Sequence, residues 1–226
     1  MSDLQSAFSN PEFVAKYAEG PPRLVPGYTG MLSMVKVLVA ERVSNDARLL
    51  VLGAGGGLEM KAFAQAEPGW TFDGIDPSAE MLELARRTLG PLAPRVRLHH
   101  GYIDDAPEEP FDAATCLLTL HFVPANERLR TATEVHRRLK PGAPFVVVHF
   151  SFPQGDGERA LWSSRHAAFV TGSGIDREVA AKALEAPKHL HILSPEQDEA
   201  ILREAGFSNV TLFYAGLTFR GWVAYA

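Results

Sequence analysis

Between Arg48 and Phe150, short apolar runs alternate with longer segments in which apolar residues recur at helical spacing. Repeated strand–helix units of this kind favour a mainly parallel sheet, because each helix carries the chain back to start the next parallel strand. The expected strands are RLLVLGA from Arg48, TFDGID from Thr71, VRLHHGY from Val96, FDAATCLL from Phe111 and PFVVVHF from Pro144. The sequence therefore predicts a doubly wound α/β fold.

The helix boundaries carry clear local signals. Ser78 is placed to cap a helix that ends at Gly90. Near the carboxyl end, Ser194 and Gln197 have the spacing of a capping box, and Gly206 is expected to stop that helix. The final residues, NVTLFYAGLTFRGWVAYA, read as two strands joined through Ala215 and Gly216. So short a connection favours an antiparallel pair at the end of the sheet.

Two portions stand outside this repeating pattern, although the whole chain, 1–226, is expected to be a single domain. Residues 1–45 contain two expected helices separated by GPPRLVPGYTG, and they would form an N-terminal cap. Residues 151–193 form a long segment before the last helix, which we expect to be a helical, lid-like insertion. Within it, Trp162 and Phe169 share a helical face, for which core burial is the favoured interpretation.

Charge and cysteine content narrow the class of protein. The chain has 22 basic against 27 acidic residues, a net charge of −5, with no basic run, so nucleic acid is not an expected partner. The only cysteine, Cys116, lies in an apolar run and is expected to be a buried strand residue. No secretory leader or membrane-spanning stretch is recognised, which predicts a cytoplasmic protein without a membrane partner. The oligomeric state, including a homodimer, is left open.

A glycine turn follows the first expected strand, in LLVLGAGGGLEM. Glycines at the end of a parallel strand let the backbone approach a ligand closely, and the next helix points its free N–H groups toward the same opening. The second signal is Asp76, at the end of the next strand. In a doubly wound sheet a carboxylate at that position can accept hydrogen bonds from ribose hydroxyls. Together the two signals predict a ribose-bearing cofactor.

The turn does not match two common nucleotide motifs. Leu58 stands at the third glycine position of a dinucleotide turn, and no Gly-Lys-Ser/Thr follows as in a P-loop. Instead, GAGGG, Asp76, GYIDDAP, FDAATCLLTLHF and RRLKPGAPFVVVHFS, in that order, resemble the class I S-adenosylmethionine-dependent methyltransferases. The resemblance runs from about Leu49 to Ala226. It implies a Rossmann-like, mainly parallel seven-stranded sheet with an antiparallel last strand, and S-adenosylmethionine as the cofactor.

The resemblance also implies roles for individual residues. Asp76 would hold the ribose, and Leu118 would lie beneath the sulfonium. The remaining cofactor residues are Gly53, Ala54 and Gly55 at the methionine part, Pro77 or Met81 near the adenine, and Tyr102, Ile103 and Asp104 at the adenine edge. Two positions depart from the family pattern: Val51 and Tyr102 stand where acidic residues are common. Backbone groups, or Asp104 and Glu59, are the candidates for compensation.

The N-terminal segment resembles a narrower group. PEFVAKYAEGPPRLVPGYTGMLSMV is similar to the leader of carboxy-S-adenosylmethionine synthase and related methyltransferase-like proteins, which implies that Tyr28 reaches the cofactor. Leu117 stands where that synthase has an asparagine, and we find no match for its carboxylate-binding arginine. Tyr17 could close the site from the same segment, although core packing is the favoured interpretation.

Histidines are the candidates for proton transfer, because their reference pKa is about 6.5. His121, just beyond the fourth expected strand, is the first candidate catalytic residue, and His149 is the second. A hydrogen-bonded structural histidine is the favoured interpretation for both. His189 and His191 lack further ligands at suitable spacing, so no metal is expected.

The leading hypothesis is thus an S-adenosylmethionine-dependent methyltransferase acting on a small-molecule acceptor. One alternative is an enzyme that uses or makes a modified sulfonium cofactor, in the manner of the synthase above. Another is a non-catalytic cofactor-binding module, since Val51 and Tyr102 could mark a lost site. A nicotinamide dehydrogenase is disfavoured by the missing third glycine.

Overall fold

The computed structural model describes residues 10, 14, 17–174 and 190–226. Its strands are β1 (Arg48–Leu52), β2 (Thr71–Asp76), β3 (Val96–His100), β4 (Ala113–Leu117), β5 (Pro144–Phe150), β6 (Ser208–Gly216) and β7 (Phe219–Tyr225). They form one seven-stranded sheet in the order β3-β2-β1-β4-β5-β7-β6. The first five strands pair in parallel, and β7 pairs antiparallel with both β5 and β6. The predicted fold is confirmed.

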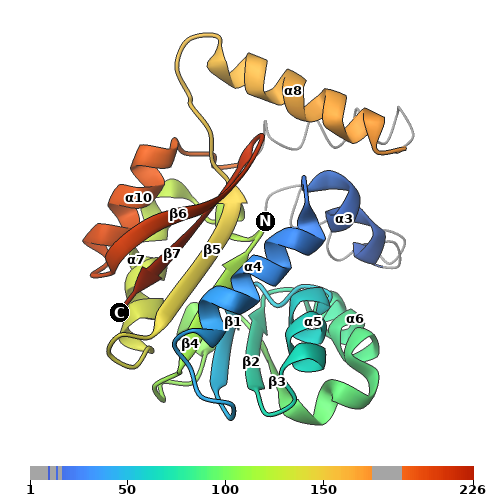
Figure 1. Ribbon diagram of the computed structural model, residues 1–226, viewed down its shortest axis with the longest axis vertical. Helices are drawn as coiled ribbons and strands as arrows, with labels where there is room; N and C mark the ends of the chain where they lie inside the picture. The colour runs from blue at the N-terminus through green and yellow to red at the C-terminus, as the bar shows by residue number, and fades with distance from the viewer. Residues whose placement is uncertain (1–9, 11–13, 15–16, 175–189) are drawn as a thin grey trace.

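Helices cover both faces of the sheet (Figure 1). On one face lie α4 (Tyr28–Ala40), α5 (Leu58–Ala66) and α6 (Ala79–Leu89), and on the other lie α7 (Ala125–Arg137) and α10 (Pro195–Glu204). Short 3₁₀ segments are η1 (Tyr17–Glu19), η2 (Gly90–Arg95), η3 (Ile103–Asp105) and η4 (Leu120–Phe122). Within the described part of the chain, every helix is too short or too polar to span a bilayer.

Both faces of the central strands are buried, which explains why β1 reads as a continuous apolar run. Leu49 and Val51 belong to the core beneath α4, α5 and α6, whereas Leu50 and Leu52 belong to the core beneath α7 and α10. Cys116 is a free cysteine buried in the second core, as predicted. The sheet is therefore a rigid platform whose strand ends hold the loops that follow them.

The predicted helix caps are present. The Ser78 hydroxyl accepts a hydrogen bond from the backbone N–H of Met81 at the start of α6. Ser194 and Gln197 form a reciprocal capping box at the start of α10. These contacts satisfy N–H groups at the start of the helix that have no partner within it. They join residues three positions apart, so the local sequence could predict them.

Two sequence expectations need correction. The stretch GPPRLVPGYTG does not simply separate two helices: α3 (Gly20–Leu24) lies within it, and α4 begins at Tyr28. Proline is tolerated in the first turn of a helix, where its missing N–H has no partner to lose, so the two prolines do not prevent α3. The β6–β7 turn lies at residues 217–218, two residues beyond the predicted Ala215–Gly216, with Leu217 at a φ of 52°.

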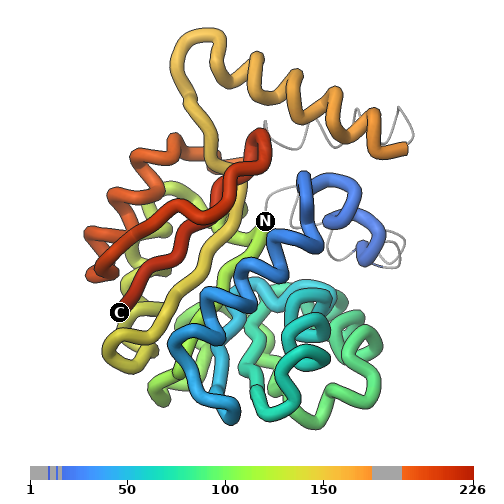
Figure 2. The backbone as a smooth tube through the Cα atoms, in the orientation of Figure 1, coloured from blue at the N-terminus to red at the C-terminus, as the bar shows by residue number. Residues whose placement is uncertain are grey.

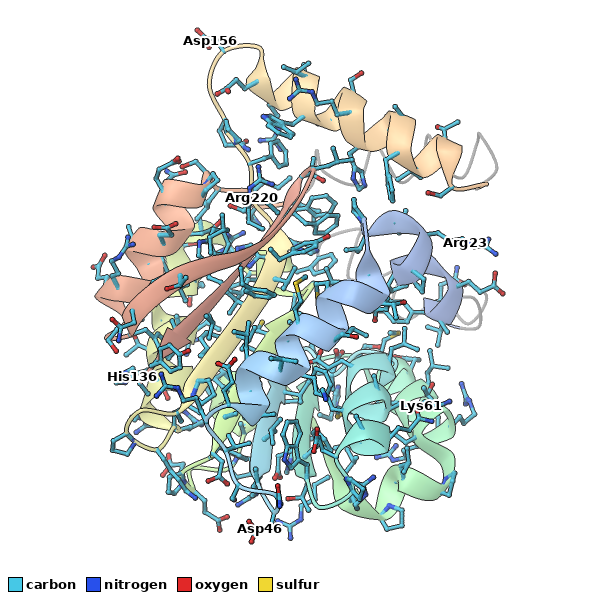
Figure 3. The ribbon with its side chains drawn as sticks, in the orientation of Figure 1. Arg23, Asp46, Lys61, His136, Asp156 and Arg220 are labelled. Carbon is cyan, nitrogen blue, oxygen red and sulfur yellow. The ribbon has the colours of Figure 1, made fainter. Side chains whose placement is uncertain are left out.

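The chain folds over one end of the sheet. After β5 it makes a wide loop to α8 (Glu158–Gly172), which lies with α3 beyond the ends of the parallel strands (Figures 1 and 2). Arg220, at this end of β7, faces the Trp162 ring of α8 at 5.4 Å, whereas Asp46 lies at the opposite end of the molecule (Figure 3). Within the insertion, α8 accounts for 158–172 and the described flanks, 151–157 and 190–193, are not helical, while 175–189 lie outside the described residues.

Candidate functional site

Two adjoining cavities open at the carboxyl ends of β1 and β4. The strand order changes direction between these two strands, and ligands of doubly wound sheets bind at such a switch point. The larger cavity measures about 420 Å³ and the smaller about 30 Å³. Gly53, Gly55, Tyr17 and Leu118 line both cavities.

The predicted cofactor residues gather on these cavities. Gly53, Gly55, Asp76, Pro77, Met81, Tyr102, Ile103 and Leu118 line the larger one, and Tyr28, Gly53, Ala54, Gly55 and Leu118 line the smaller one. Of the predicted cofactor residues, Asp104 is the one that lines neither cavity. Residues far apart in the sequence are thus brought to one edge of the sheet.

The glycine turn is fastened to the neighbouring strand and closely packed. The backbone N–H groups of Gly53 and Ala54 both donate to the carbonyl of Ile75 at 2.9 Å. Gly53 has a φ of 79°, and a Cβ added there would lie 2.7 Å from the Cβ of Thr119. Position 53 therefore requires glycine for both backbone conformation and space.

Asp76 is held in place by backbone donors from two elements. Its Oδ2 accepts from the N–H of Gly55, and its Oδ1 accepts from the N–H of Ser78, both at 2.9 Å. Burial raises the pKa of the Asp76 carboxyl, and these two hydrogen bonds oppose that rise. The carboxylate is thus oriented on the larger cavity, with lone pairs left for a diol.

Arg130, which lines the larger cavity, forms an exposed ion pair with Asp104. Arg130 on α7 holds both carboxylate oxygens of Asp104 at 2.9 Å, which ties η3 to α7. Asp104 is therefore engaged at the surface, so its predicted contact with the adenine edge stays a prediction. Tyr102 lines the cavity but is 57% exposed, so a planar ligand could stack against its ring.

Comparison with known proteins points to one class. Residues 49–142 match the family described as a methyltransferase domain. The carboxy-S-adenosyl-L-methionine synthase of Chromohalobacter salexigens is 29% identical over 222 residues, covering 94% of this chain and 80% of that protein.

Solved structures agree in fold. An O-methyltransferase family protein from Burkholderia thailandensis superposes with a TM-score of 0.71 at 17% identity, covering 98% of this chain and 62% of that one. Human N-acetylserotonin methyltransferase in complex with S-adenosylmethionine gives 0.60 at 17% identity, covering 94% and 58%. The chain thus spans about three fifths of the length of these two structures.

Residues 49–142 thus match a methyltransferase domain, and the chain has the fold of solved S-adenosylmethionine-dependent methyltransferases. This agrees with the resemblance read from the sequence motifs, and it makes the protein an enzyme of the transferase class with S-adenosylmethionine as its cofactor. The cavities fit that cofactor, because they combine a glycine cradle, an oriented carboxylate and a volume within the range of small-molecule sites.

The methyltransferase domain is completed by tyrosines from the N-terminal segment. Tyr17 lines both cavities, and its hydroxyl lies 3.3 Å from where a Cβ on Gly55 would stand. Tyr28, the first residue of α4, lines the smaller cavity. Burial raises the pKa of both phenols, and the nearby carboxyl of Glu59 adds to the rise, so both stay protonated at neutral pH.

Leu118 is strained at the point where the two cavities meet. Its φ of 59° is unusual for a branched side chain, and its N–H donates to the carbonyl of Val148 at 2.6 Å. Backbone strain of this kind is found most often at functional sites, where the surroundings hold the residue in place. The predicted position of Leu118 beneath the sulfonium stays a prediction, and the geometry is compatible with it.

His121 lies beside the larger cavity rather than on it. Its ring packs 4.5 Å from the ring of Phe122, which does line the cavity, and its Nδ1 accepts from the N–H of Phe150 at 3.2 Å. Burial holds the pKa of His121 well below its usual value, so the imidazole is neutral. His149 is also buried, with its Nε2 3.2 Å from Asp198 Oδ2.

His166, in the insertion, lines neither cavity. His166 is buried on α8, where burial lowers its pKa to about 4, and its Nδ1 lies 3.1 Å from Thr218 Oγ1. Among the described residues, no group of three potential ligands is placed to hold a metal. His189 lies outside the described residues.

Sequence reasoning missed several cavity residues. Thr119 and Phe122 line the larger cavity, as do Glu127 and Arg130 of α7. Arg130 and Glu127 lie on a helix that reads as an ordinary solvated amphipathic helix, so no local signal marks them. Tyr17 was interpreted as core packing, and its place on both cavities became visible only with the fold.

Proposed function

We propose that the chain binds S-adenosylmethionine across both cavities and transfers its methyl group to a small molecule. The observation that carries this proposal is the oriented carboxylate of Asp76 facing the same cavity as the Gly53–Gly55 turn. The methionine part would lie along the turn, the ribose at Asp76, and the adenine between Met81 and Ile103. A small acceptor is favoured because the net charge is −5 and the sequence has no basic run.

The cofactor supplies an activated methyl group on its sulfonium, so the protein's contribution is alignment and exclusion of water. Asp76 would hold the ribose, and the apolar side chains of Leu118 and Phe122 would form the wall near the reacting methyl. Tyr17 would close the site from the N-terminal cap. A general base is required only for an acceptor that must lose a proton.

His121 is retained as the candidate base for its place after β4, although burial lowers its pKa and its Nδ1 lone pair accepts from the N–H of Phe150, both of which weaken it as a base. Its ring is one residue away from the cavity wall, so the acceptor would have to reach it past Phe122. Replacing His121 by glutamine is expected to lower kcat while leaving S-adenosylhomocysteine affinity unchanged. An unchanged kcat would reduce His121 to a structural residue.

The lid-like insertion is proposed to select the acceptor. Its helix α8 contacts the sheet end through His166, whose ring packs edge-on against the stacked rings of Phe150 and Phe219 at 5.6 Å from each. Shortening the insertion should alter acceptor preference while S-adenosylhomocysteine still binds. Unchanged preference would remove this role. The lone buried Cys116 supports a reducing, cytoplasmic setting, and a homodimer is compatible with the fold.

A second candidate is supported by the similarity to carboxy-S-adenosyl-L-methionine synthase, which extends over 94% of this chain and 80% of that protein. In that case the cavities would hold a carboxylated sulfonium cofactor. Against it stands Leu117, where that synthase has an asparagine.

Mass spectrometry of the ligand retained through purification separates the two candidates. S-adenosylmethionine or S-adenosylhomocysteine supports methyl transfer. A carboxylated cofactor supports the second candidate and overturns the first.

A further inference from the structure

The smaller cavity has room for one small polar group. At about 30 Å³ it can hold a water-sized group, and it adjoins the larger cavity along Gly53, Gly55 and Leu118. A ligand that fills the larger cavity can therefore place one terminal group in the smaller one. The chemistry of its walls decides which group that is.

The distinctive wall residue is Glu59, the second residue of α5. Its side chain is buried, and it accepts a hydrogen bond from the hydroxyl of Thr115 on β4. Within the described part of the chain, Thr115 is its only hydrogen-bond partner. The ionisable groups that face it are the phenols of Tyr17 and Tyr28 and the thiol of Cys116, none of them cationic.

A buried carboxyl without a counter-charge is costly for a protein to keep. Buried carboxylates are normally paired with a cation or a metal, because the charge loses its hydration. Glu59 has no cation within the described residues, yet it borders an open space of the size of an ammonium group. That combination indicates a cationic ligand group.

The position of Glu59 relative to the sheet strengthens the argument. Thr115 pairs in register with Val51 of β1, so their side chains project from the same face of the sheet. The residue on β1 is apolar, and the carboxyl at this point comes instead from the helix that follows the turn. Glu59 lies in the first turn of α5, where the helix dipole favours negative charge.

We propose that Glu59 binds the α-ammonium group of the cofactor's methionine end, with Tyr28 forming the opposite wall of the smaller cavity. This inference rests on the proposed binding of S-adenosylmethionine. Of the polar groups at that end, the ammonium is the one that can both donate to Glu59 and supply the missing counter-charge, whereas the sulfonium is attached to three carbons and belongs in the larger cavity.

Binding of the ammonium group should release a proton from Glu59. Burial raises the pKa of Glu59 to about 8, so the carboxyl is mostly neutral at pH 7 in the free protein. An ammonium group beside it favours the carboxylate, so the proton leaves as the ligand binds. Affinity should then fall about tenfold for each pH unit below 7. The phenols and the thiol stay protonated throughout this range and do not contribute.

The test compares two ligands and two variants by calorimetry. S-adenosylhomocysteine carries the ammonium as its only cation, and 5′-methylthioadenosine keeps the adenine and ribose but lacks the amino-acid part. Glu59→Gln should weaken S-adenosylhomocysteine binding by about 10- to 100-fold, the value of a charged hydrogen bond. It should leave 5′-methylthioadenosine unchanged. The matched control is Glu83→Gln, which alters an exposed acid on α6 outside both cavities.

Proton release provides a second readout. Titrations at pH 7 in two buffers of different ionisation heat should show close to one proton released per S-adenosylhomocysteine by the natural protein. Glu59→Gln should show a reduced release, while 5′-methylthioadenosine should show little release with either protein. Because the two ligands share the ribose, any contribution from Asp76 cancels in this comparison.

Each outcome decides a separate claim. Unchanged S-adenosylhomocysteine binding in Glu59→Gln, or equal weakening of both ligands, overturns the role of Glu59 and leaves the proposed function standing. Failure of the natural protein to bind either ligand overturns the proposed function itself. Should Glu59→Gln not fold, Thr115→Val decides, because it removes the hydrogen bond that orients the carboxyl. Weakening confined to S-adenosylhomocysteine then supports the role, and any other result overturns it.

Discussion

The carboxylate of Asp76 is held in a fixed orientation before any ligand binds. Backbone N–H groups of Gly55 and Ser78 fix both of its oxygens. Replacing Asp76 by alanine is expected to weaken S-adenosylhomocysteine binding by roughly 1–3 kcal/mol, because buried hydrogen bonds to the ribose are lost. Binding of 5′-methylthioadenosine should weaken equally, since it carries the same ribose. Unaltered affinity in calorimetry would place the ribose elsewhere.

Gly53 should tolerate no side chain. Alanine there would overlap Thr119 and would adopt an unfavourable φ of 79°. We expect Gly53→Ala to lower the free energy of unfolding by roughly 1–3 kcal/mol and to impair cofactor binding. Gly30→Ala is the matched control, because no atom lies within 4 Å of its added Cβ and α4 should gain roughly 0.5–1 kcal/mol. Equal effects of the two changes, measured by urea denaturation, would contradict this account of the turn.

Glu59 should make the stability of the ligand-free protein depend on pH. Its pKa is raised from 4.5 to about 8 in the folded state, so the folded protein binds more protons between those values. Stability therefore falls as pH rises through this window, by up to about 1.4 kcal/mol per pH unit. Urea denaturation at pH 5.5 and 7.5 should show a smaller fall for Glu59→Gln than for the natural protein. An identical fall in both proteins would mean that Glu59 ionises normally.

At the scale of elements, a buried ion pair joins α7 to α10. Arg128 and Asp198 are both buried, their Nη1 and Oδ1 lie 2.8 Å apart, and Arg128 also donates to the carbonyl of His191. Replacing Asp198 by alanine leaves the guanidinium buried and unpaired, so a loss of about 3–5 kcal/mol of unfolding free energy is expected. Glu108→Gln, in an exposed pair with Arg137, should change stability by less than about 1 kcal/mol. Similar losses in both variants would refute the importance of burial.

Local sequence carried most of the information about elements and little about contacts between them. Strand positions, the Ser78 cap and the capping box at Ser194 were predictable, because each depends on neighbouring residues. The helix α3 was missed because its prolines look like a break. The hydrogen bond between Glu59 and Thr115 joins residues 56 apart in the chain, so only the fold shows that they meet.

In the candidate site too, local features could be predicted from the sequence and contacts between elements could not. The glycine turn and Asp76 were recognisable because both follow apolar strands that end at one edge of a parallel sheet. His121 was chosen for its position after β4, and its packing against Phe122 and Phe150 could not be read from spacing. The ion pair between Asp104 and Arg130 links two elements and was likewise hidden.

For the whole molecule, the central claim is that a sulfonium cofactor binds at the carboxyl ends of β1 and β4, at the end of the sheet beyond which α3 and α8 lie (Figure 1). The most direct test is a calorimetric titration with S-adenosylmethionine and S-adenosylhomocysteine, with NAD as the control. Saturable binding of both sulfur compounds at one site, without binding of NAD, is the result expected here. Binding of neither sulfur compound, or of NAD in their place, would contradict it.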